Sequence, residues 1–151
     1  MIPISSQYSV KPIEVLIVDD SNSDLRIVEE TFKRGKLHVN IHSVKDGIYA
    51  IEYLKMSKNG DNVYPDLILL DLNMPRKDGM ELLEEIKSNE DFKKIPVIVM
   101  TISKEQEDVL KSYNLHANAY VVKPIELNQF IATIRSIEDF WFTIVKLPTQ
   151  I

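Results

Sequence analysis

The run EVLIVDD at residues 14–20 decides the fold. Four consecutive apolar residues followed by two carboxylates are typical of a strand that is buried on both faces and ends at a polar edge. Four further runs rich in apolar and β-branched residues follow, at residues 38–44, 66–71, 95–101 and 119–122. The run at 38–44 alternates polar and apolar side chains, so we expect it at an edge of the sheet.

Helical stretches separate these runs. Apolar residues recur there every three or four positions, for example at Leu25, Val28 and Phe32 in the first stretch. Strand–helix alternation repeated five times predicts an α/β fold, a doubly wound five-stranded parallel sheet with helices on both faces. Because crossovers between parallel strands are right-handed, few strand orders remain, and the flavodoxin-like order 2-1-3-4-5 is the commonest of them.

The composition narrows the classes of protein that the chain can be. It has 151 residues and no cysteine, which suits one domain and excludes disulfide scaffolds, thiolate zinc sites and cysteine catalysis. The net charge of −5 argues against a nucleic-acid partner. No apolar run approaches the ~20 residues that span a membrane, and residues 1–10 lack the basic start of a secretory signal. We therefore expect a cytoplasmic protein with no nucleic-acid and no membrane partner.

Polar residues gather where the predicted strands end. In chain order they are Asp19 and Asp20, Asp71 with Asn73 just beyond it, Thr101, and Lys123. In a doubly wound parallel sheet, ligands bind outside the carboxyl ends of the strands, at the point where the winding reverses. We expect these side chains to meet in one shallow crevice there.

Their chemistry suggests phosphoryl transfer. Three carboxylates in one crevice repel one another unless a cation joins them, and oxygen ligands without imidazole or thiolate favour Mg²⁺. A carboxylate beside a divalent cation, an ammonium and a hydroxyl is what nucleophilic attack on a phosphoryl group requires. Each residue alone has an ordinary structural role, such as an aspartate pair that starts a helix. Compatible groups at four strand ends favour the functional interpretation.

Four stretches carry a family resemblance: VLIVDDSNSD, LILLDLNMPRKDGMELL, VIVMT and AYVVKP. Over about residues 14–137 they resemble the receiver domain of bacterial and archaeal two-component response regulators, the family of the chemotaxis regulator CheY. The resemblance implies that Asp71 is the phosphoacceptor and also a metal ligand. It implies that Asp20 binds Mg²⁺ directly, with Asp19 beside it or acting through water, and that Asn73 offers its backbone carbonyl to the metal.

The same resemblance implies a switch. Thr101 would supply the hydroxyl that moves toward the phosphoryl group, and Lys123 would be its charge partner. Tyr120 stands where the family keeps an aromatic side chain that changes rotamer. The family also implies a cis peptide bond between Lys123 and Pro124.

A narrower resemblance lies nearer the carboxyl end. YNLHANAY at 113–120 and FIATIRSIEDFWFTIVKLP at 130–148 look like the single-domain regulators that partner phytochrome-type sensor kinases. We expect an N-terminal tail at 1–12, a receiver domain at 13–138, and at 139–151 an extension of the last helix with a C-terminal tail and no output domain. The implied function is a stand-alone phosphoacceptor that takes a phosphoryl group from a histidine kinase and changes its partner binding or dimerisation. Such a protein is not an enzyme beyond its own phosphorylation and dephosphorylation.

Three alternatives remain beside this interpretation. A pseudo-receiver scaffold would not accept phosphate, and the intact acidic set with Thr101 and Lys123 argues against it. Phosphatases of the haloacid dehalogenase type also use Mg²⁺ and a strand-end aspartate, but they carry a second aspartate where this chain has Asn73. A flavin carrier on this fold would need a Ser/Thr/Gly-rich loop after the first strand. We expect no phosphorelay or metal-binding role for the three histidines, His38, His42 and His116.

Two features depart from what one receiver needs. Ile102 follows the predicted switch hydroxyl, where the family usually has a small residue, so we expect its branched side chain to slow both phosphorylation and hydrolysis. On a helical wheel begun at Leu127, the apolar stripe runs from about 280° through 0° to about 40°, and Phe140 lies near 220°, outside it. Phe140 and Trp141 therefore predict a homodimer through the last helix; the alternative is that the tail folds back over them.

Overall fold

A five-stranded parallel sheet forms the centre of the molecule, in the order β2-β1-β3-β4-β5. The structure is a computed structural model and describes residues 11–74 and 77–150, so most of the predicted tail at 1–12 lies outside the described residues. The strands are β1 (Ile13–Val18), β2 (Val39–Val44), β3 (Leu67–Leu70), β4 (Val97–Thr101) and β5 (Ala119–Val122). Both the α/β class and the predicted strand order are confirmed.

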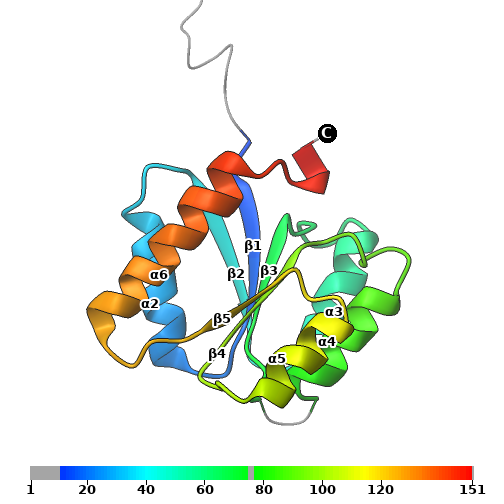
Figure 1. The fold of residues 1–151 in the computed structure, drawn as a ribbon. Helices are drawn as coiled ribbons and strands as arrows, with labels where there is room; N and C mark the ends of the chain where they lie inside the picture. Colours follow the sequence, from blue (N-terminus) through cyan, green and yellow to red (C-terminus); the bar gives the residue numbers. More distant parts are fainter. Residues whose placement is uncertain (1–10, 75–76, 151) are drawn as a thin grey trace, which may run out of the picture.

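Helices cover both faces of this sheet (Figure 1). They are α2 (Asn22–Lys33), α3 (Gly47–Lys58), α4 (Gly79–Ser88), α5 (Gln106–Asn114) and α6 (Leu127–Asp139). Helices α2 and α6 lie side by side on one face, and α3, α4 and α5 cover the other. Ser21 caps the start of α2, because its hydroxyl accepts a hydrogen bond from the Asp24 N–H (3.2 Å).

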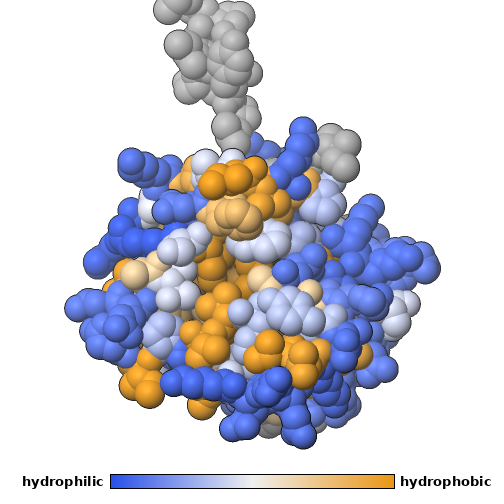
Figure 2. Space-filling model, viewed as in Figure 1, coloured by the Kyte–Doolittle hydropathy of each residue, from blue (hydrophilic) through white to orange (hydrophobic). Residues whose placement is uncertain are grey.

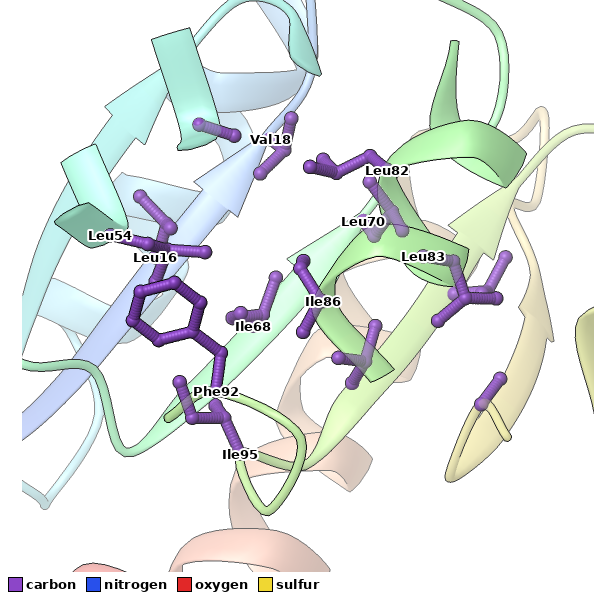
Figure 3. Packing of buried hydrophobic residues seen from close by; sticks show 14 of the residues in the cluster. Leu16, Val18, Leu54, Ile68, Leu70, Leu82, Leu83, Ile86, Phe92 and Ile95 are labelled. Atoms are coloured by element: carbon purple, nitrogen blue, oxygen red, sulfur yellow. The ribbon is translucent and has the colours of Figure 1, made fainter. Parts of the chain in front are cut away.

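Alternation along the strands divides the core into two layers. In β1, Leu16 and Val18 pack toward α3 and α4, whereas Val15 and Ile17 pack toward α2 and α6. Figure 3 shows the first layer, in which side chains of β1 and β3 meet Leu82, Leu83, Ile86 and Phe92. Strands β1, β3 and β4 are buried on both faces, which explains their unbroken apolar sequences. Strand β2 is only half-buried, as its alternating sequence predicts.

The chain beyond α6 does not continue as an α-helix. It forms a π-helical stretch, η1 (Phe140–Ile144), in which the Val145 N–H donates to the Phe140 carbonyl (3.0 Å), and then a short 3₁₀ turn, η2 (Pro148–Gln150). Phe142 and Leu147 are buried in the layer beneath α2 and α6, and the Phe142 ring lies 5.5 Å from the ring of Phe32. The C-terminal segment therefore completes this layer.

No helix within the described ranges is both long and apolar enough to cross a membrane.

Candidate functional site

Asp19 and Asp71 lie at the carboxyl ends of the neighbouring strands β1 and β3. The Asp71 N–H donates to the Val18 carbonyl (2.9 Å), and the Asp19 N–H donates to the Val44 carbonyl of β2 (3.1 Å). Both residues thus extend the strand pairing by one step, which fixes their backbones. Asp19 is 3% exposed and Asp71 is 8% exposed, whereas Asp20 beside them faces solvent.

These three aspartates form one acidic group. One carboxylate oxygen from each of Asp19, Asp20 and Asp71 lies within 4.8 Å of the other two. Oxygen donors that are partly buried and open to water on one side fit a hard divalent cation such as Mg²⁺ or Mn²⁺, which keeps several waters. The nearby Asn73 is exposed and its N–H donates to Asp71 Oδ1 (3.1 Å); the metal role of its carbonyl stays a prediction.

The ammonium of Lys123 lies among carboxylates at the end of β5. Its Nζ is 2.7 Å from Asp19 Oδ2, 2.8 Å from Asp24 Oδ2 and 3.1 Å from Asp71 Oδ2. The side chain is only 4% exposed. Burial alone would lower the pKa of Lys123, but these carboxylates outweigh burial and hold that pKa above its usual value. Lys123 is therefore charged at neutral pH.

Burial is the main influence on the charge state of Asp19. Burial raises the pKa of Asp19 above its usual value, and the charge of Asp71 adds to that rise. Hydrogen bonds from Lys123 and from the Ser21 N–H (2.9 Å) offset the rise only in part. A cation bound here would favour the charged carboxylate in the same way as Lys123 does, so the surroundings of Asp19 fit a site that a divalent cation completes.

Asp24 is a member of this site that the strand-end pattern does not predict. It lies in the first turn of α2, where an acidic residue is usually explained by the helix dipole. Its side chain is 26% exposed, yet its Oδ2 accepts from Lys123. The available signal was its position in the first turn of the helix that follows β1, which begins at the same edge of the sheet.

Thr101 and Lys123 are joined through their backbones. Thr101 is fully buried, and its carbonyl accepts from the Lys123 N–H (2.7 Å) across β4 and β5. Its hydroxyl lies 3.4 Å from Asn73 Nδ2, which is a long hydrogen bond. The predicted hydroxyl, lysine and aspartates therefore meet at one edge of the sheet.

The family model for the response regulator receiver domain matches residues 15–135 of this chain. The chain belongs to this family. The response regulator Rcp1 of Synechocystis is 42% identical over 144 residues, which cover 95% of this chain and 98% of Rcp1. A chemotaxis protein CheY-3 of Vibrio cholerae is 33% identical and covers 76% of this chain and 82% of its own length.

Solved structures show the same receiver fold. The Mn²⁺-bound form of Rcp1 is 41% identical and superimposes with a TM-score of 0.86, covering 91% of this chain and 99% of the other. The phosphorylated cyanobacterial phytochrome response regulator RcpA is 37% identical, with a TM-score of 0.87 and the same coverage. These relatives do not favour the pseudo-receiver or the phosphatase. Receivers in general are not classical enzymes.

The backbone at the start of α4 lies close to the backbone of Asp71, the candidate phosphoacceptor. The N–H of Gly79, at the start of α4, donates to the Leu72 carbonyl (3.0 Å). A Cβ at Gly79 would collide with the backbone of Asp71 and Leu72. The glycine of the KDGMELL stretch therefore lets α4 begin directly behind Asp71.

Two residues predicted to modulate the receiver lie beside the site. The Tyr120 hydroxyl donates to the Ser103 carbonyl (2.9 Å), and the ring is half-buried. Ile102 is 66% exposed and lines a cavity of about 290 Å³ together with Lys123 and Pro124. The predicted cis bond before Pro124 was wrong: no peptide bond in the described residues is cis. The trans form of such a bond is favoured by about 0.5–1 kcal/mol without any help from the fold.

The two predicted interface residues lie far from this site, at the other end of α6 (Figure 1). Phe140 is 50% exposed, and its ring meets that of Trp141 edge to face at 5.7 Å. Trp141 is half-buried against the layer beneath α2 and α6. Phe142, the next residue, is buried in that layer by the chain itself.

Proposed function

We propose that this receiver takes a phosphoryl group from the phosphohistidine of a sensor histidine kinase onto Asp71. The observation that carries the proposal is the buried Asp71 carboxylate, which lies 3.1 Å from the Lys123 ammonium and within the acidic group. Asp71 Oδ attacks phosphorus, the bond from phosphorus to the imidazole nitrogen breaks, and the imidazole leaves with the electron pair and takes up a proton.

The residues around Asp71 have distinct tasks in this transfer. A Mg²⁺ ion held by Asp19, Asp20, Asp71 and the Asn73 carbonyl would supply positive charge to the phosphoryl oxygens when bound. Lys123 donates to one of those oxygens, and burial keeps its long side chain in place.

The test is labelling by acetyl phosphate in the presence of Mg²⁺, followed by mass spectrometry. Asp71→Asn keeps the size and hydrogen bonding of the side chain but removes the nucleophilic charge, so we expect labelling to vanish while circular dichroism stays unchanged. Asp61→Asn, which changes an exposed aspartate, is the control and should be labelled like the parent. Labelling of Asp71→Asn at the parent rate would reject the assignment.

Phosphorylation of Asp71 would shift a two-state equilibrium at β4 and β5. Thr101 moves its hydroxyl toward the phosphoryl group, and Tyr120 gives up its bond to Ser103 and turns inward. The consequence is a changed surface at α5, β5 and α6. Tyr120→Phe removes only the hydroxyl, so we expect normal phosphorylation with a smaller change in the amide NMR spectrum of α5.

Ile102 would slow the chemistry because it lines the same cavity as Lys123. Its exposed branched side chain lines the cavity beside the ammonium, across the path of small donors and water. We expect Ile102→Ala to speed both phosphorylation by acetyl phosphate and hydrolysis of the phosphoprotein. Unchanged rates would show that the side chain only faces solvent.

A phytochrome-type sensor kinase is the donor that we propose. RcpA is a cyanobacterial phytochrome response regulator, and the similarity to RcpA and Rcp1 extends over more than nine-tenths of this chain. Phosphotransfer from an autophosphorylated phytochrome-type kinase should therefore be faster than transfer from a chemotaxis-type kinase. Equal transfer would remove the preference.

We also propose a homodimer through α6 and η1. Figure 2 shows apolar side chains at the top of the view, over the end of α6, where Phe140 is 50% and Ile144 is 73% exposed. Exposed aromatic anchors of this kind dominate interfaces, each costing roughly 2 kcal/mol or more when truncated. We expect Phe140→Ala to weaken the dimer, and Trp141→Ala to do so with some loss of stability. Sedimentation of the parent as a monomer at tens of micromolar, phosphorylated or not, would reject the dimer and leave the segment as a lid.

A further inference from the structure

The Lys123 ammonium has no hydrogen atom to spare in the described structure. An ammonium group carries three N–H donors, and three carboxylate oxygens lie within hydrogen-bonding distance of Nζ. In the proposed transfer to Asp71, Lys123 donates to a phosphoryl oxygen. Lys123 must therefore release at least one of its present partners.

The three partners differ in where they come from. Asp19 and Asp71 belong to the acidic group that fits a divalent cation, but Asp24 does not. Asp24 comes from α2. Among the charged groups of the site that the structure describes, Lys123 is the one with which it forms an ion pair. Its side chain is 26% exposed, against 5% for Asp19 and 10% for Asp71, so water can solvate it after release.

Asp24 is also close enough to act on the phosphoryl group itself. Because both oxygens contact Nζ, Asp24 Oδ2 and Asp71 Oδ2 are no more than about 6 Å apart. Asp24 also lines the cavity of about 290 Å³ that it shares with Ile102 and Lys123. An anionic phosphodonor that enters there meets a negative charge beside its cationic target.

We infer that Asp24 is a positioning residue that competes with the phosphoryl group for Lys123 and thereby limits how fast Asp71 is phosphorylated. The inference rests on the proposed role of Asp71 as the phosphoacceptor. In this inference Asp24 does not bind the metal. Its negative charge holds Lys123 and repels the anionic phosphodonor.

Substitutions at this position separate charge from structure. Asp24→Asn keeps an oxygen that accepts from Lys123 but removes the negative charge. We expect its rate of phosphorylation by acetyl phosphate, at saturating Mg²⁺ and low salt, to rise about three- to tenfold. Asp24→Glu restores the charge and should return the rate to within about twofold of the parent. Glu29→Gln makes the same charge change at an exposed position of α2 and should match the parent as well.

Ionic strength supplies a readout that a merely structural role would not move. The screening length falls from about 10 Å at 0.1 M salt to about 3 Å at 1 M. The advantage of Asp24→Asn over the parent should therefore shrink as salt is added, while thermal unfolding shows that both proteins stay folded.

The outcomes separate this inference from the proposed function. If the parent is not labelled, or if Asp71→Asn is labelled equally, the phosphoacceptor assignment fails and the role of Asp24 fails with it. If the parent is labelled at Asp71 but Asp24→Asn is no faster, the role of Asp24 alone is overturned. An equal gain in Glu29→Gln would also overturn it, because the effect would then belong to the net charge of α2.

Discussion

Helices α5 and α6 flank the same edge strand, β5, but they are held in very different ways (Figure 1). Helix α6 buries three large apolar side chains, those of Phe130, Ile134 and Ile137. Helix α5 buries only Ser112 and leaves Leu110 55% exposed. One side of β5 is thus fixed by packing, and the other side is free to shift at little cost in buried area.

This difference matters for the proposed switch. Tyr120 of β5 bonds to Ser103 in the loop before α5, and its N–H donates to the Tyr113 hydroxyl of α5 (3.2 Å). Polar contacts of this kind contribute only about 0.5–1.5 kcal/mol each, so a phosphoryl group at Asp71 can compete with them. We therefore expect most of the change at the α5, β5 and α6 surface to come from movement of α5, because the buried side chains of α6 hold that helix in place.

The largest expected effect tests the comparison directly. Ile134 is fully buried, so Ile134→Ala should lower the free energy of unfolding by about 3–4 kcal/mol through lost burial and the cavity that remains. Leu110→Ala, the matched change in α5, should cost less than about 1 kcal/mol because its side chain is half exposed. Urea unfolding measures both. Equal losses would show that α5 is packed as firmly as α6.

The sequence predicted the sheet because its strands are buried on both faces. Short unbroken apolar runs such as residues 15–18, bounded by polar residues, are typical of central parallel strands, and right-handed crossovers then leave few strand orders. The same logic predicted the meeting of Asp19, Asp71 and Lys123, since the carboxyl ends of all strands in a parallel sheet lie at one edge. This reasoning did not predict Asp24, because Asp24 belongs to a helix and does not end a strand.

The C-terminal segment was harder to predict for a different reason. A helical wheel assumes 100° per residue, and that assumption ends at Asp139, where the backbone changes to π-helical geometry. On the same wheel Phe142 would lie at about 60°, close to the apolar stripe, and it is buried in the layer beneath α2 and α6, whereas Phe140 at about 220° is exposed. No periodicity in the sequence marks the change to π-helical geometry.

A smaller effect is expected within this segment. Leu147 is fully buried although it lies only four residues from the end of the sequence. Leu147→Ala should lower the free energy of unfolding by about 2–3 kcal/mol, less than Ile134→Ala because the segment can relax into the space. Lys146→Ala, at an exposed position of the same segment, is the control and should stay within about 0.5 kcal/mol of the parent. A negligible loss in Leu147→Ala would mean that the segment is not part of the α6 side.

One buried residue of α6 weakens the firmly packed side. Counting about 100° per residue from Leu127 places Glu138 at about 20°, inside the apolar stripe, and it is only 7% exposed. Its Oε2 has no hydrogen-bond partner among the residues that the structure describes. Its carboxylate also lies against the backbone of Gly35, where any Cβ would collide with it. Gly35 does not have a left-handed backbone, and the end of the Glu138 side chain would have to shift to admit a Cβ there.

The smallest expected effect follows from this carboxyl group and depends on pH. Burial and then the charge of Asp139 raise the pKa of Glu138, while the Leu37 N–H and Arg135 lower it only in part. A raised pKa in the folded protein means that folding favours the protonated form, so stability is highest below the usual glutamate pKa and falls as pH rises through the folded value. Glu138→Gln imitates the protonated form and should match the parent at pH 4 but unfold at a higher temperature than the parent at pH 7. Glu84→Gln, at an exposed position of α4, should show no such divergence between the two pH values. If Glu138→Gln and the parent unfold at the same temperature at pH 7, the charged carboxylate is already solvated. In that case Glu138 does not destabilise the buried face of α6.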